Sequence, residues 1–64
     1  MAMATRAEIG SLATTLEELT RRVSALAEGA NRDDEELAVD LFGVERSLNG
    51  ALRRLRKLAE QQRD

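Results

Sequence analysis

Apolar residues recur three and four positions apart along two long segments of the chain. The first segment carries Ile9, Leu12, Leu16, Leu19, Val23 and Leu26. The second segment carries Leu37, Leu41, Val44, Leu48, Ala51, Leu55 and Leu58. Alternating spacings of three and four place side chains on one face of an α-helix. We call these residues the seam, and they predict two amphipathic helices of the coiled-coil type whose shared core they form.

Short polar signals mark the predicted ends of the first helix. Thr5 precedes Glu8 by three residues, which is the spacing of a capping box. Gly29 predicts the end of the helix, because glycine readily takes the left-handed conformation that closes one. The first helix is therefore expected over about residues 6–28.

The second helix is predicted over about residues 34–62, after a turn at residues 29–33. Asp33 can cap it, and Glu36 stands three positions further on. The run of acids from residue 33 to residue 36 also favours the positive end of a new helix dipole.

A short turn makes consecutive helices antiparallel, so the predicted fold class is all-α, an antiparallel helical hairpin. The hairpin forms a single domain over residues 1–64, with residues 1–5 as N-terminal lead and cap. With a turn at this place, Leu16 is expected opposite Val44.

Small and apolar residues also flank the seam, where a simple two-stranded coiled coil carries Glu and Lys. These flanking residues are Ala13, Thr20, Ala27, Ala38, Leu52 and Ala59. An apolar stripe of this width is typical of a bundle of four helices. A chain of 64 residues is also near the size at which a lone domain is marginally stable. We therefore expect two hairpins to pair as a homodimeric four-helix bundle.

Charge along the second helix favours an antiparallel dimer. Residues 33–49 hold six acids and one base, a net charge of −5. Residues 50–64 hold five bases and two acids, a net charge of +3. Two antiparallel copies would set each acidic end against a basic end. We expect a twofold axis near residues 47–50.

Val39 and Phe42 form a second apolar pair that faces away from the seam. Two interpretations give this pair a role: a contact between subunits with Phe42 as its anchor, or a docking patch for another protein. A third is partial exposure without function. The candidate interface comprises Val39, Phe42, Gly43, Ser47, Gly50 and Leu52.

Composition argues against several kinds of chemistry. The chain has no cysteine and no histidine, so disulfides and the commonest transition-metal ligands are missing. Serines and threonines lack a histidine to activate them, and the four glycines are scattered rather than gathered in a phosphate loop. We expect no enzymatic activity, no cofactor and no metal site.

The chain also lacks an apolar run long enough for a membrane span, which predicts a soluble cytoplasmic protein without membrane contact.

One basic cluster could contact anions. It consists of Arg53, Arg54, Arg56 and Lys57. Cations near a helix C-terminus are favoured by the helix dipole without any ligand, and the formal net charge of the chain is −2. Nucleic-acid binding is therefore the weaker interpretation of this cluster.

These patterns predict a small non-enzymatic adaptor that binds or regulates another protein as a homodimeric helical bundle. Two alternatives remain open. One is a nucleic-acid-associated regulator that uses the cluster at residues 53–57, and the other is an oligomerisation module with no partner beyond itself.

Overall fold

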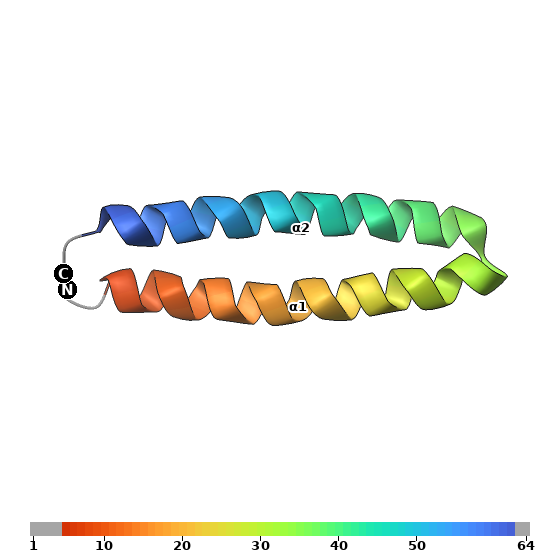
Figure 1. Ribbon diagram of the computed structural model, residues 1–64, viewed down its shortest axis with the longest axis horizontal. Helices are drawn as coiled ribbons and strands as arrows, with labels where there is room; N and C mark the ends of the chain where they lie inside the picture. The colour runs from red at the N-terminus through yellow and green to blue at the C-terminus, as the bar shows by residue number, and fades with distance from the viewer. Residues whose placement is uncertain (1–4, 63–64) are drawn as a thin grey trace.

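Two long helices packed side by side make up the computed structural model, which describes residues 5–62 (Figure 1). Helix α1 spans Thr5–Asp33 and helix α2 spans Glu35–Gln61. The helices run antiparallel and form a rod of 47 by 14 by 13 Å. The predicted all-α helical hairpin is confirmed.

Asp34 alone connects the two helices. Its backbone is extended, with φ −148° and ψ 90°. Its amide donates to the Ala30 carbonyl at 2.7 Å, and its own carbonyl accepts from the Ala38 amide at 3.0 Å. The Asp34 carboxylate accepts a hydrogen bond from the Leu37 amide at 3.1 Å and so caps α2. One residue therefore closes one helix and starts the next.

The helix ends differ from the sequence prediction mainly at the turn. α1 continues through residues 29–33, where the turn was expected, and Gly29 does not end it. No glycine between residues 5 and 62 has a positive φ, so none supplies the left-handed cap. The cap is Asp34 rather than Asp33. Residues 1–4 of the predicted lead lie outside the described residues.

This turn changes the pairing of the helices. Because both helices meet at Asp34, residues equally far from it along the chain lie at the same level of the rod. Leu16 is therefore level with Leu52, and not with Val44 as expected.

The line of closest contact consists mostly of small residues. The most buried side chains of the hairpin are Ala13, Thr20, Ala27, Ala38 and Leu52. Within each helix these positions repeat at multiples of seven, so they lie along one line of each helix. Alanine at such a line lets two helix backbones approach closely. The flank of the predicted stripe is thus the interior of the hairpin.

Thr20 is the polar member of this line and is 6% exposed. Its hydroxyl donates to the Leu16 carbonyl of the preceding turn at 2.7 Å, so the buried hydroxyl is satisfied.

Neither described helix is apolar over a stretch long enough to cross a bilayer.

Candidate interaction surface

The outer half of the seam lies open on one side of the hairpin. Six of its large residues are between 44% and 59% exposed: Leu12, Leu19, Leu26, Leu37, Val44 and Leu58. Ala51, which falls on the same line of α2, is also exposed. These residues were expected in the core, and in the single chain they are not covered.

The inner half of the seam lies between the exposed line and the contact line. It consists of Ile9, Leu16, Val23, Leu41, Leu48 and Leu55, and each of these side chains is half-buried. The difference from the expected core has a geometric cause: the small residues of the contact line draw the helices together one position away from the seam. We call the seam residues of both helices, as they lie in this structure, the apolar face.

Charged residues occupy the opposite rim of the hairpin. The guanidinium of Arg56 lies 3.1 Å from the Glu17 carboxylate and joins the two helices. Arg21 lies 3.7 Å from the same carboxylate, one turn further along α1. All three side chains are well exposed, so each ion pair contributes at most about 1 kcal/mol. At this rim the Glu17–Arg56 ion pair joins the two helices, whereas the apolar face is open.

Phe42 lies on the side of the charged rim. At 100° per residue, Phe42 and Val44 point about 200° apart on α2, while Phe42 and Arg56 lie within about 40° of each other. Phe42 is half-buried, and Val39 is 68% exposed. The pair therefore lies outside the apolar face, with Phe42 partly covered within the hairpin itself.

The other residues of the candidate interface are not brought together. Leu52 is 6% exposed and already packs inside the hairpin, so it is not available to a partner. Ser47 is exposed beside the apolar face. A side chain added at Gly43 would meet nothing within 4 Å, and one added at Gly50 would meet only the Arg53 guanidinium at 3.9 Å. Neither glycine serves a close approach within the single chain.

The basic cluster spreads around the outer surface of α2. Its four side chains are exposed, and that of Arg56 is already engaged by Glu17. Arg53, Arg54 and Lys57 border an open depression over Gly50. These three cations therefore share one stretch of the outer surface of α2.

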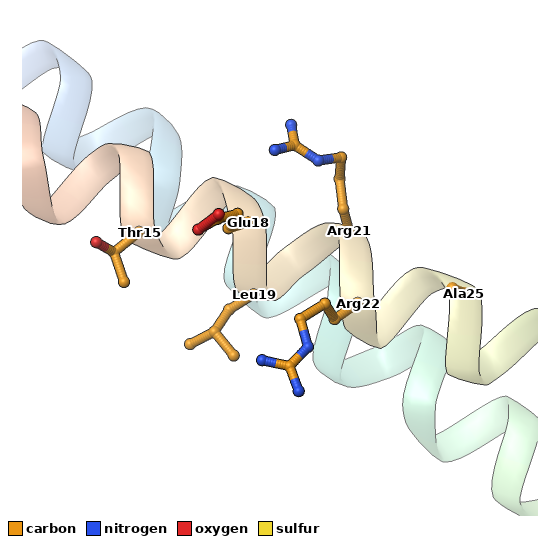
Figure 2. Close-up of a pocket in the computed structure, with 6 residues that line it drawn as sticks. All are labelled: Thr15, Glu18, Leu19, Arg21, Arg22 and Ala25. Carbon is orange, nitrogen blue, oxygen red and sulfur yellow. The ribbon is translucent and has the colours of Figure 1, made fainter.

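A further depression lies on α1 alone (Figure 2). Its residues are Thr15, Glu18, Leu19, Arg21, Arg22 and Ala25. The side chains of Leu19 and Arg22 extend to the same side of the helix, whereas that of Arg21 extends to the other. The depression is the border between the apolar face and its polar edge rather than an enclosed cavity.

Within residues 5–62, no cluster of three or more acidic, histidine or cysteine side chains is arranged to hold a metal ion.

Comparison with protein families, with curated proteins and with solved structures finds no match to this chain. The open apolar face is the most pronounced surface feature of the described structure and is therefore the candidate site.

Proposed function

We propose that this chain is a non-enzymatic protein–protein interaction module that acts as a homodimeric four-helix bundle and serves as a binding or regulatory adaptor. The observation that carries the proposal is the apolar face. Contiguous exposed apolar surface of this kind marks interaction sites on soluble proteins. The face follows both helices from end to end and occupies one whole side of the rod.

The interior of the single hairpin is small, which supports the need for a partner. The buried hydrophobic residues are three alanines and Leu52, and within residues 5–62 no large side chain is fully buried. Full burial of one leucine contributes about 1.5–3 kcal/mol, so covering the half-exposed leucines of the apolar face would add several kcal/mol to the stability of the hairpin.

The shape of the face suits a dimer. It runs along a rod 47 Å long and 14 Å wide, so a second rod of the same length can cover it from end to end. Pairing two such faces leaves the opposite side of the rod, with the exposed Val39 and the half-buried Phe42, open to a different protein. This arrangement provides a scaffold for the adaptor role.

Light scattering on the wild-type chain and on Leu19→Asp tests the proposal. Wild type should have a mass of twice 7.1 kDa. Leu19→Asp should be monomeric or unfolded, because a carboxylate in the closed bundle would be buried without a partner. Ala25→Asp, on the exposed outer surface of α1, is the matched control and should remain dimeric. A monomeric wild-type hairpin would exclude the homodimer.

A second candidate function is supported by the grouping of Arg53, Arg54 and Lys57 around Gly50. These exposed cations could hold backbone phosphates of a nucleic acid as a regulator. Binding to duplex DNA or RNA that is lost with added salt and in Arg53→Glu would support this function. Absence of binding at low salt would exclude it. If neither nucleic acid nor another protein binds, a pure oligomerisation module is what remains.

A further inference from the structure

The seam residues of α2, which we call its apolar stripe, are arranged almost symmetrically about the centre of the stripe. The midpoint between Leu37 and Leu58 falls between residues 47 and 48. About this midpoint, Leu41 mirrors Leu55 to within one residue, and Leu48 lies at the centre. Val44, a larger residue, mirrors the smaller Ala51. Two antiparallel copies of α2 can therefore cover each other along their whole length without unpaired seam residues.

Between Leu12 and Leu26, the stripe of α1 is symmetric about nearly the same level of the rod, whereas Ile9 mirrors Gly29 and lies outside this symmetry. Leu12 and Leu26 are equally far from Leu19, and Leu16 mirrors Val23 to within one residue. Leu19 is level with residue 49, measured from the turn at Asp34. This level differs from the centre of α2 by about one and a half residues, or roughly 2 Å. A single twofold axis across the hairpin therefore satisfies both helices.

Charge selects this arrangement over the alternative in which both turns lie at the same end. Between residues 20 and 48, next to the turn, the hairpin holds seven acids and four bases. The open end, residues 5–19 and 49–62, holds five bases and four acids. Copies with adjacent turns would bring their acidic ends together, whereas copies with opposite turns place an acidic end beside a basic end.

Two exposed residues on the outer edge of the α2 stripe give this complementarity a specific contact. Asp40 and Arg54 are each seven residues from Ser47, on the edge that borders the exposed line of the seam. In antiparallel copies of α2 centred on the midpoint between residues 47 and 48, Asp40 of each copy lies within one residue of the level of Arg54 of the other.

We infer that the occupant of the apolar face is a second copy of this chain, docked with its turn at the opposite end and with Leu48 opposite Leu48 and Leu19 opposite Leu19. The inference rests on the proposed dimer and adds its orientation and register. Asp40 and Arg54 form two symmetric ion pairs at the edge of the contact.

Distances between spin labels test the orientation, and a chain without cysteine allows single labels to be placed cleanly. Labels at Ser47→Cys, near the axis, should lie within about 25 Å of each other, given helix spacings of 8–10 Å. Labels at Gln61→Cys should lie about 40 Å apart, because some 27 residues of helix separate them. A short distance at both sites would overturn the orientation while preserving the dimer. If no interaction between two labels is detected and the mass in solution is 7.1 kDa, the dimer itself is refuted. The occupant of the apolar face would then be a different protein.

Charge exchange tests the register. Asp40→Arg alone and Arg54→Asp alone should each weaken self-association about tenfold, because both symmetric pairs become repulsive. An equimolar mixture of the two variants should form heterodimers in preference to either homodimer, since both pairs then regain opposite charges. Lys57→Asp, on the outer surface away from the seam, is the matched control for a change from base to acid at a nearby site. Random mixing of the Asp40→Arg and Arg54→Asp variants would overturn the assigned contact.

Discussion

Residue size determines which side of each helix faces the hairpin interior. Ala27 is 0% exposed and Ala38 is 1% exposed, although larger apolar side chains stand next to both. The leucine beside each alanine, Leu26 and Leu37 respectively, remains 45–59% exposed. Small residues thus set the spacing of the helices, and the large residues are left partly exposed.

Ala27→Leu should destabilise the hairpin by about 1–3 kcal/mol, because a larger side chain at the contact line forces the helices apart. Urea unfolding followed by circular dichroism measures the change. Ala25→Leu places the same side chain on the exposed outer surface of α1 and should change stability by less than about 0.5 kcal/mol. Equal effects of the two substitutions would contradict the assigned contact line.

Gly29→Ala should stabilise the protein by about 0.5–1 kcal/mol. Gly29 lies inside α1 without a positive φ, and an added methyl group would meet nothing within 4 Å. Alanine restricts the unfolded chain and favours the helix. Thermal melting measures the gain, and Ala25→Gly should lower stability by a similar amount. A loss of stability in Gly29→Ala would mean that the helix ends at the glycine.

At the scale of the helices, a single residue that hydrogen-bonds to both helices forms the turn. Asp34 donates its amide to the last turn of α1, and its carbonyl and carboxylate accept from the first turn of α2. Arg32, in the last turn of α1, is placed favourably for the helix dipole. The turn therefore needs neither glycine nor a longer loop.

Asp34→Ala should cost about 1 kcal/mol, within the range of 0.5–2 kcal/mol for loss of an N-cap. The change removes the carboxylate that accepts from the Leu37 amide. Chemical denaturation measures it, with Asp33→Ala as the matched control of similar charge and exposure. A larger effect of Asp33→Ala would identify Asp33 as the cap, as the sequence alone indicated.

The sequence predicts the helices of this protein better than the way they pack. The spacing of the seam residues correctly indicates two antiparallel helices, because the period of the pattern depends on local geometry. The end at Gly29 was wrong, because a glycine can terminate a helix but does not have to. The contact line was also missed, because Ala13, Thr20 and Ala27 are weakly hydrophobic. Their spacing of seven residues was the signal for a close helix contact.

At the scale of the whole molecule, the hairpin is a rod with two different sides. One side is joined by the Glu17–Arg56 ion pair, and the other exposes the apolar face. If a partner covers the open side, as proposed, the stability of the hairpin should depend on the presence of that partner.

The melting temperature should accordingly rise with protein concentration. In the proposed dimer, association stabilises the folded state by mass action, and dilution removes this contribution. Circular dichroism melts over a hundredfold range of concentration measure the effect. Leu19→Asp should lose the dependence. A melting temperature that is independent of concentration in wild type would argue for a hairpin that is stable alone.

The single-residue connection at Asp34 also bears on how the chain reaches its structure. Only one residue separates the helices, so the first contacts between them close a very short loop and cost little chain entropy. Contacts further from the turn become local once those nearer to it have formed. We expect the hairpin to close progressively from Asp34 toward the open end, at the high rates of proteins dominated by local contacts, before two copies meet.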